Sequence, residues 1–568
     1  MELLTADILI IGAGGAGLLA ALHAHEADRR LKIVIAVKGL LGQSGCTRMV
    51  QGGYNAVLNP ADSLQRHFQD TMKGGAFLNN QELAWILVED APKRIIELEN
   101  KVGCLFDRRE DGTIHQKPFA GQSFDRTVHK GDLTGIEIMS NLRDYILEHD
   151  IQVLEECRGL DFLHSGSRIS GAVLLDIRSG RLIAARAAAT LVCTGGGATM
   201  YRISSPSLEK SGDGMAMACR AGAEFLDMEM MQFHPTGLLV GRSMATGGLL
   251  EEGLRGAGAR LFNGRGERFM ERYDQEKKER ATRDVVSRSS YLEIAAGRGT
   301  AAGGVLLDAS HLGEKFLLEN FPGMVERCRD YGFDLLHEAV EVSPSAHYQM
   351  GGIRIDEHCR TSLDGLFSAG EDAGGVHGAN RLGGNGVADS VVFGARAGDV
   401  MVDYTGTTVP AEISMAEAES IGERWCRFLR QDAGENVFYL RQELEDLTWE
   451  KVGVVRDEEK LSQAVCSLVS LQERVARVKA GGREFNAEWN EAINVTNLAL
   501  VAEMIARSAQ IREESRGAHF RSDFPSAEPR WLKNICVMRG NGGLEFSFRP
   551  LVFSRLQPPD LEATQEKQ

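Results

Sequence analysis

The 568-residue sequence lacks the features that mark several common classes of protein. Its longest apolar stretch, Ile8–Leu22, is interrupted by four glycines and is shorter than the roughly 20 residues that a membrane span requires. No basic segment with a small-residue cleavage site precedes it, so no secretory signal is predicted. Positive charge is scarce, because 64 Lys and Arg face 80 Asp and Glu and leave a net charge of −16. Nucleic acid is therefore not an expected partner.

Metal-binding patterns are also missing. The ten cysteines form no CxxC pair and none clusters with histidine, so no metal site, neither zinc nor iron–sulfur, is predicted. Scattered reduced thiols are typical of a cytoplasmic protein, which we expect here, with attachment to the inner face of a membrane only through partner subunits. Proline is sparse, at 13 residues, whereas glycine is abundant, at 64. The glycines lie in short clusters, which indicates close backbone approach to a bound molecule.

The first glycine cluster predicts a nucleotide-binding unit. An apolar run, Asp7–Ile11, leads directly into Gly12-Ala13-Gly14-Gly15-Ala16-Gly17, which is followed by a helical pattern and a second apolar run. In such a unit Gly12 permits a tight turn, Gly14 lets the backbone approach a pyrophosphate, and Gly17 lets the helix pack on the strand. The N-terminus of the helix then faces the phosphates.

The acidic residue that usually binds ribose at the end of the second strand is absent. Val37 and Lys38 occupy its place. Lys38 could contact a phosphate instead, or it could be a solvated surface lysine.

Other strands that end in glycine lie far along the chain. Leu182–Cys193 precedes a glycine triplet, and Leu363–Ala369 precedes Gly370. We therefore expect one sheet assembled from distant segments, with a second domain inserted between them. From about residue 411 to 514 the apolar residues follow the spacing of three to four that is typical of packed helices.

Charged and histidine-containing clusters accompany the later glycines. Taken singly, each His or Arg is compatible with a buried structural role or a surface ion pair. Together, beside glycine-rich turns, they indicate a functional site. The clusters are Gln232–Gly237, Glu251–Gly256, Gly266–Met270, Arg283–Arg288, His347–Gly352 and Gly378–Asn385.

In this order and at these separations, the clusters resemble the flavoprotein subunit of succinate dehydrogenases and fumarate reductases. The resemblance runs from about residue 6 into the C-terminal segment, where Glu514–His519 and Asp523–Pro525 also fit. It implies an α/β fold in which a Rossmann-like FAD-binding domain carries an inserted α+β capping domain, followed by a helical bundle and a small C-terminal domain. The implied boundaries are 1–239 with 342–410, then 240–341, 411–515 and 516–568, the last with a disordered tail from residue 558.

The resemblance also implies the cofactor site. FAD would be held by residues of the N-terminal glycine cluster and by residues from later segments of the FAD-binding domain. Asp213 could accept the ribose hydroxyls, and the helix that starts near Val387 would direct its backbone N–H groups at the pyrimidine side of the flavin. The full set is Gly12, Gly14, Gly15, Gly17, Lys38, Cys46, Gly52, Gly53, Asp213, Glu371, Gly386 and Val387.

The remaining clusters are implied to bind and convert a dicarboxylate. His234, His347 and Arg381 would hold the carboxylates, because a dianion in a closed cavity needs fixed donors and cations. Arg283 would transfer a proton, relayed through Glu252 and Arg255, while flavin N5 exchanges the hydride.

The sequence departs from the family pattern at two of these positions. Cys46 stands where respiratory members carry the histidine that bonds covalently to flavin, so we expect non-covalent FAD, with a cysteinyl flavin as the alternative. Glu251 stands where the family usually has a Thr or Ser that binds a substrate carboxylate. A carboxylate there would repel a diacid unless it were protonated or salt-bridged, which leaves open an altered substrate.

The expected function is interconversion of fumarate and succinate, or of a related acid pair, by an FAD-dependent subunit of an electron-transfer complex. An iron–sulfur subunit is the expected partner, because the chain carries no cluster ligands of its own; membrane, thiol-linked or quinone-linked subunits are further possibilities. The alternatives are a soluble enzyme similar to L-aspartate oxidase, or a flavin electron-relay subunit with an altered substrate site. The reaction direction and the electron donor are left open.

Overall fold

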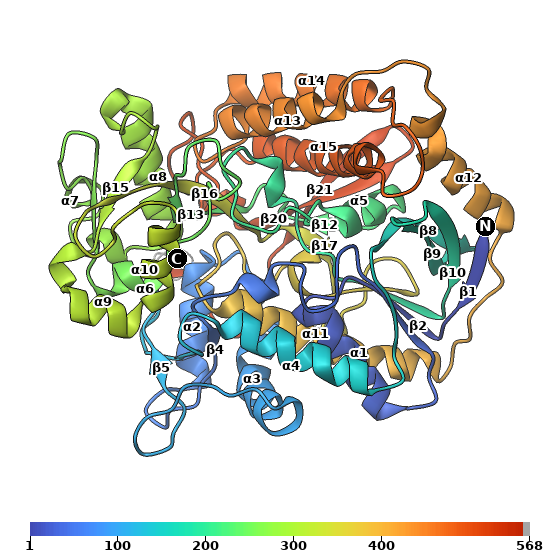
Figure 1. Cartoon of the computed structure of the whole chain (residues 1–568), viewed down its shortest axis with the longest axis horizontal. Helices are drawn as coiled ribbons and strands as arrows, with labels where there is room; N and C mark the ends of the chain where they lie inside the picture. Colours follow the sequence, from blue (N-terminus) through green and yellow to red (C-terminus); the bar gives the residue numbers. More distant parts are fainter. Residues whose placement is uncertain (560–568) are drawn as a thin grey trace, which may run out of the picture.

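The computed structural model describes residues 1–559 (Figure 1). Residues 560–568, which make up most of the tail expected to be disordered, lie outside the described residues. No helix among residues 1–559 is both long enough and apolar enough to cross a membrane. The same residues contain no group of three or more His, Cys, Asp or Glu side chains arranged to hold a metal ion.

A parallel sheet lies at the centre of the nucleotide-binding part. Its strand order is β18-β11-β2-β3-β7, and every pair of neighbours is parallel. Parallel sheets are covered on both faces, which is why β2 and β3 consist of buried apolar residues only. The strands come from distant segments, as the sequence predicted. They are β2 (Ile8–Ile11), β3 (Ile33–Ala36), β7 (Gln152–Leu154), β11 (Ala189–Val192) and β18 (Leu366–Ser368).

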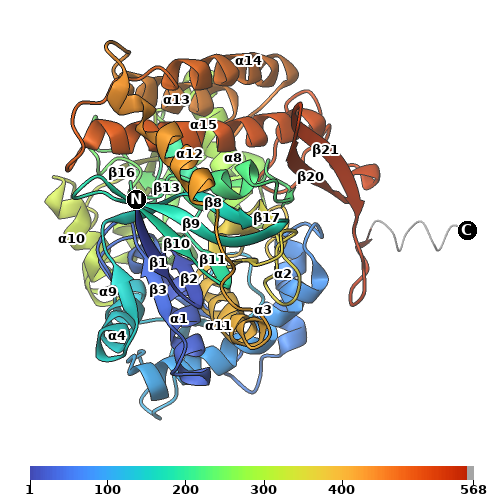
Figure 2. The same ribbon diagram turned by 90° about the vertical axis from the view of Figure 1, so that its right-hand side faces the viewer.

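Two helices from opposite ends of this part pack closely on one another. They are α1 (Gly15–Ala27) and α11 (Asn385–Thr405), which Figure 2 shows beside α4 (Thr134–Glu148) on one side of β2 and β3. A Cβ atom at Gly394 would lie 2.4 Å from the carbonyl oxygen of Ala16. Glycine at this point is what lets the middle of α11 lie next to the start of α1.

A second sheet covers the other face. Its order is β1-β10-β9-β8, and α5 packs against β8. A further small sheet has the order β4-β6-β5, and Lys117 at the end of β5 forms an ion pair with Glu251 next to the inserted segment's first helix. The elements are β1 (Glu2–Thr5), β8 (Cys157–Ser165), β9 (Arg168–Asp176), β10 (Arg181–Arg186), α5 (Asp213–Arg220), α2 (Leu64–Gly74), α3 (Gln81–Glu97), β4 (Tyr54–Asn55), β5 (Gln116–Lys117) and β6 (Thr127–Val128).

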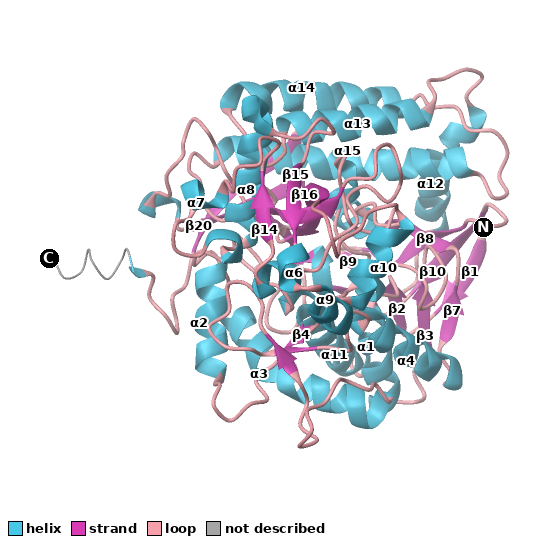
Figure 3. Ribbon diagram, turned by 60° about the vertical axis from the view of Figure 1, so that its left-hand side comes forward, coloured by secondary structure: helices cyan, strands magenta, loops and turns pink. Residues whose placement is uncertain are grey.

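The inserted segment has an apolar core of its own, formed by residues between Leu238 and Val342. It combines short helices with an antiparallel sheet of order β13-β16-β15-β14 (Figure 3). Its strands lie on both sides of the boundaries that the resemblance implies: β14 and β15 lie within residues 240–341, β13 ends just before them, and β16 crosses residue 342. The elements are β13 (Met231–Leu238), α6 (Glu252–Ala257), β14 (Arg260–Phe262), α7 (Met270–Tyr273), α8 (Arg283–Glu293), β15 (Val305–Asp308), α9 (Glu314–Asn320), α10 (Pro322–Asp330) and β16 (Val340–Gln349).

The last third of the chain is helical, then β-stranded. The apolar residues that predicted packed helices are buried, among them Leu461, Leu468 and Leu471. The closing hairpin, β20 with β21, extends a sheet of order β19-β17-β12-β20-β21. The elements are α12 (Met415–Cys426), α13 (Val437–Lys451), α14 (Glu458–Val475), α15 (Ala487–Ile511), β20 (Lys533–Gly540), β21 (Gly543–Pro550), β12 (Phe225–Leu226), β17 (Gly352–Arg354) and β19 (Ala373–Gly374).

A buried arginine joins the helical part to the FAD-binding part. Arg512, directly after α15, is fully buried and donates hydrogen bonds to the carboxylates of Asp227, Glu229 and Glu514. Burial and the neighbouring charge of Glu229 raise the pKa of Asp227. Removing the arginine would leave these carboxylates buried without their common cation.

We expect Arg512→Met to lower the free energy of unfolding by about 3–5 kcal/mol, the usual cost of breaking a buried charge cluster. Urea unfolding followed by circular dichroism measures this. Arg530→Met is the control, because the Arg530 side chain is 64 % exposed and lies 3.8 Å from Glu513. Equal, small effects of both substitutions would contradict a bridging role for Arg512.

Candidate active site

Two cavities adjoin one another: the larger lies between the FAD-binding part and the inserted segment, and the smaller lies within the FAD-binding part. The larger has a volume of about 440 Å³ and the smaller about 120 Å³. Cys46, Lys210 and Glu371 line both, so the two cavities meet at these side chains. Together they accommodate an elongated ligand whose ends lie in different surroundings.

The glycine cluster forms one wall of the smaller cavity. Gly12, Gly14 and Gly15 line it, whereas Gly17 does not. Gly12 has a φ of +115°, and a Cβ atom there would lie 2.2 Å from the carbonyl oxygen of Cys193. A Cβ atom at Gly17 would lie 2.1 Å from the carbonyl oxygen of Gly12. The structure therefore places Gly12 at the turn and Gly17 at the contact between helix and strand.

Lys38 and Asp213 also line the smaller cavity, where they contact one another. Lys38 Nζ lies 3.2 Å from Asp213 Oδ2 and donates to Ser211 and Asn494. Burial lowers the pKa of Lys38 to about 8. Lys38 is thus neither solvated nor free, and a ligand in this cavity meets it as part of a charge network.

Arg158 completes this network and was not found from the sequence. It is fully buried on β8 and donates to Asp213 Oδ1 at 2.6 Å. Burial alone would raise the pKa of Asp213, but Arg158 and Lys38 hold it well below its usual range. An arginine at the start of an apolar strand, next to Gly159, is the signal that could have pointed to it.

At the meeting point of the cavities, Lys210 forms an ion pair with Glu371. Glu371 also accepts a hydrogen bond of 2.9 Å from the backbone of Gln349. Burial raises the pKa of the neighbouring Cys46 thiol, an effect that Lys210 partly offsets. Gly52, Gly53, Gly386 and Val387, which the resemblance assigned to the cofactor, line the larger cavity instead.

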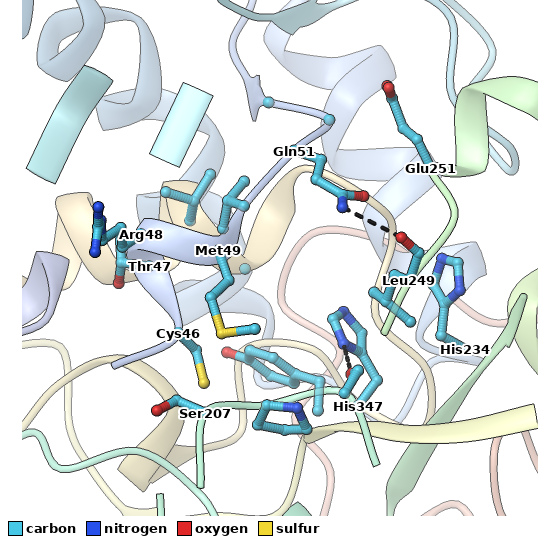
Figure 4. A pocket seen from close by; sticks show the side chains of 18 of the residues that line it. Cys46, Thr47, Arg48, Met49, Gln51, Ser207, His234, Leu249, Glu251 and His347 are labelled. Atoms are coloured by element: carbon cyan, nitrogen blue, oxygen red, sulfur yellow. Dashed lines mark hydrogen bonds between the residues drawn. The ribbon is translucent and has the colours of Figure 1, made fainter. Parts of the chain in front are cut away.

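His234 on β13 and His347 on β16 lie next to one another in the wall of the larger cavity, edge to face, with ring centroids 5.5 Å apart (Figure 4). Nδ1 of His234 lies 3.2 Å from Thr236 Oγ1, and Nδ1 of His347 lies 2.8 Å from Ser205 Oγ. Each ring therefore presents its Nε2 to a ligand. Burial and nearby arginines hold the pKa of both histidines well below the usual value. They are neutral hydrogen-bonding groups, not cations.

The positive charge in the larger cavity comes from arginine. The Arg381 guanidinium lies over the ring of Tyr348, with 4.3 Å from its central carbon to the ring centroid, and donates to Gln232 Oε1 at 3.1 Å. Burial and the charge of Arg283 lower the pKa of Arg381 to about 10, so it stays protonated at neutral pH. No carboxylate of residues 1–559 forms a salt bridge with Arg381, which leaves its charge available to an anion.

Arg283, Glu252 and Arg255 form a continuous buried chain. Arg283 donates to Glu252 Oε2 at 2.7 Å, and Arg255 donates to Glu252 Oε1 at 2.9 Å. Burial would raise the pKa of Glu252, but the two arginines hold it below its usual value. Arg255 does not line the cavity, whereas Arg283 and Glu252 do. The structure thus brings the three predicted residues into contact, with Glu252 between the two arginines.

Gln232 and Phe119 belong to the site, although the sequence analysis gave neither a role. Gln232 Oε1 accepts from both Arg283 and Arg381, each at 3.1 Å, and so fixes their spacing. The Phe119 ring lies against Gly52 and Gly383 and lines the cavity. Gln232 could have been found from its position two residues before His234. Phe119 follows no motif that we used.

Glu251 lines the larger cavity, but it does not direct its carboxylate at the histidines. Figure 4 shows the side chain pointing away from His234 and His347. Its Oε1 atom accepts a hydrogen bond of 2.5 Å from Lys117 Nζ on β5. Of the two conditions under which Glu251 would not repel a diacid, the structure meets the second, a salt bridge.

Comparison with known proteins shows the family to which the chain belongs. The family model described as FAD binding domain matches residues 7–387, and that described as fumarate reductase flavoprotein C-term matches 441–564. The chain is 42 % identical to one component of the fumarate reductase (CoM/CoB) of Methanothermobacter marburgensis, over 95 % of the chain and 98 % of that protein. It is 43 % identical to an FAD-dependent oxidoreductase of Methanocaldococcus jannaschii, itself named as uncharacterized, over 97 % and 99 %. Among solved structures, Escherichia coli quinol fumarate reductase FrdA superposes with a TM-score of 0.93 at 34 % identity, covering 98 % of both chains.

The chain belongs to the fumarate reductase and succinate dehydrogenase flavoprotein family. It is an FAD-dependent oxidoreductase. The residues present fit that cofactor, because Gly12, Gly14 and Gly15 bring backbone without side chains to the wall of the smaller cavity. In addition, α11 begins after Gly384, which has no side chain to cap it, so backbone N–H groups of its first turn remain for a ligand.

We expect FAD to bind without a covalent link, because Cys46 stands in place of the family's histidine and the raised pKa of this half-buried thiol makes it a poor nucleophile. Acid precipitation of the purified protein should release the yellow flavin into the supernatant. Flavin fluorescence that stays with the denatured chain, and is lost in Cys46→Ser, would show a cysteinyl bond instead.

Proposed function

We propose that this protein interconverts fumarate and succinate, and that its larger cavity binds the dicarboxylate. The observation that carries the proposal is the pair Arg283 and Arg381, held by one amide oxygen of Gln232, opposite two neutral histidines. A four-carbon dianion offers carboxylates at both ends, and guanidinium groups bind carboxylates through paired N–H donors.

The residues of the cavity would divide the work of binding and protonation. Arg381 would bind one carboxylate, and His234 and His347 would donate hydrogen bonds from Nε2. Arg283 would give its proton to one alkene carbon and be reprotonated through Glu252 and Arg255. When bound, FAD supplies the hydride exchange. Phe119 and the inserted segment would keep water from this step.

The electron supply is a separate part of the proposal. Residues 1–559 offer no cluster ligands, so we propose an iron–sulfur partner subunit that carries single electrons to or from the flavin. One relative is named for a reductase of the CoM/CoB type and others as flavoprotein subunits, which supports a role within a complex. Attachment to the inner face of a membrane would then come from such partners.

We expect the purified holoprotein to oxidise a reduced viologen dye when fumarate is added, with succinate as the product. The dye replaces the missing electron donor, so the measurement needs no partner. Turnover with crotonate and none with fumarate would contradict a dicarboxylate substrate and would favour a different unsaturated acid.

Arg283→Lys should lower turnover by roughly a hundredfold or more while leaving dicarboxylate affinity within a few fold, because general-acid groups contribute about 10²- to 10⁴-fold. Arg288→Lys is the matched control, since Arg288 lies on the same helix but stacks on Phe520. Normal turnover of Arg283→Lys would show that Arg283 is not the proton donor.

A further inference from the structure

Glu251 and Lys117 form a buried ion pair where the inserted segment meets the FAD-binding part. Glu251 is 3 % exposed and directly precedes α6, while Lys117 lies at the end of β5. Their charged atoms are 2.5 Å apart. Lys117 Nζ also lies 3.3 Å from the carbonyl oxygen of Gly131, so this ammonium is held at the boundary by groups from two segments.

The second carboxylate oxygen of Glu251 has no such partner. Among the described residues, nothing forms a hydrogen bond with Glu251 Oε2, although the atom is buried. Burial, Asp132 and Glu252 raise the pKa of Glu251, and Lys117 lowers it. Lys117 is thus the one cation that forms a salt bridge with this carboxylate within residues 1–559.

Because of the position of Glu251, its ion pair with Lys117 affects the binding of a ligand in the larger cavity. Glu251 lines the cavity that contains Arg283 and Arg381. An unpaired carboxylate in that wall would be attracted toward these arginines. There it would either occupy the position of a substrate carboxylate or repel that carboxylate. With Lys117 present, the side chain points away from His234 and His347 (Figure 4).

We propose that Lys117 determines specificity for a dianionic substrate, because it neutralises Glu251 and holds its carboxylate out of the cavity. The inference rests on the proposed function and explains how a glutamate is tolerated at this position. Lys117 acts through Glu251 and is a positioning residue. Lys117 itself does not line the larger cavity.

The proposal predicts that the cost of losing Lys117 depends on ligand charge and on Glu251. In oxidised holoenzyme, Lys117→Met should weaken binding of fumarate, a dianion, by roughly tenfold or more, as expected for one uncompensated buried charge nearby. Binding of crotonate, the monoanion with the same alkene, should weaken much less. The double variant Lys117→Met/Glu251→Gln should regain fumarate affinity to within about threefold of the unmodified protein, because the buried charge is gone.

The pH dependence separates this effect from a loss of packing. Without Lys117 the pKa of Glu251 rises further. At low pH the carboxyl is therefore protonated and neutral, and it does not repel a substrate carboxylate. Fumarate affinity of Lys117→Met should therefore fall as pH rises, whereas the double variant should follow the unmodified protein. Lys130→Met is the matched control, since Lys130 lies just after β6, the strand that pairs with β5, and its side chain is 43 % exposed and 3.5 Å from Asp107.

Flavin absorbance changes and titration calorimetry both measure this binding, without turnover. Fumarate affinity that is unchanged in Lys117→Met, or lost equally in the single and double variants at every pH, would overturn the proposal. An unmodified protein that binds fumarate but does not reduce it would overturn the proposed function alone. An unmodified protein that binds no fumarate would overturn both.

Discussion

The site depends on keeping positive charge buried without neutralising it. A guanidinium group loses its hydration when it is buried, and a carboxylate partner is the usual compensation. Arg283 and Arg255 share a single carboxylate, that of Glu252, and Arg381 has the face of Tyr348 and two neutral oxygens. The cavity therefore keeps more positive than negative charge, which is the condition for binding a dianion.

The fold supplies what this arrangement needs. The parallel sheet brings the glycine cluster and the start of α11 to neighbouring places, although they are more than 350 residues apart. The inserted segment brings Arg283 on α8 and Glu252 on α6 over the same cavity, while β13 supplies Gln232 between the two arginines. Since these residues come from separate elements, the site exists only when the inserted segment lies against the FAD-binding part.

The glycine cluster could be predicted from sequence because it carries a strong local signal, whereas the arginine roles were expected only from the family resemblance. The positions of Gly12 at the turn and of Gly17 at the contact between helix and strand could be predicted, because neither place leaves room for a side chain. Lys38 and Glu251 could not be predicted in the same way, because their partners, Asp213 and Lys117, are 175 and 134 residues away. The protonation state of His234 and His347 could not be predicted from the sequence either, because it depends on burial and on arginines from other elements.

The most direct test of the central claim is the number of protons taken up when fumarate binds to the oxidised protein. Calorimetric titration near pH 7.5, in buffers of different ionisation enthalpy, gives this number. The account predicts a value near zero, because the arginines already carry the charge that the dianion needs and the histidines bind it in their neutral form. Uptake of about one proton or more would contradict it, since the positive charge would then have to be created at His234 or His347 as the ligand binds.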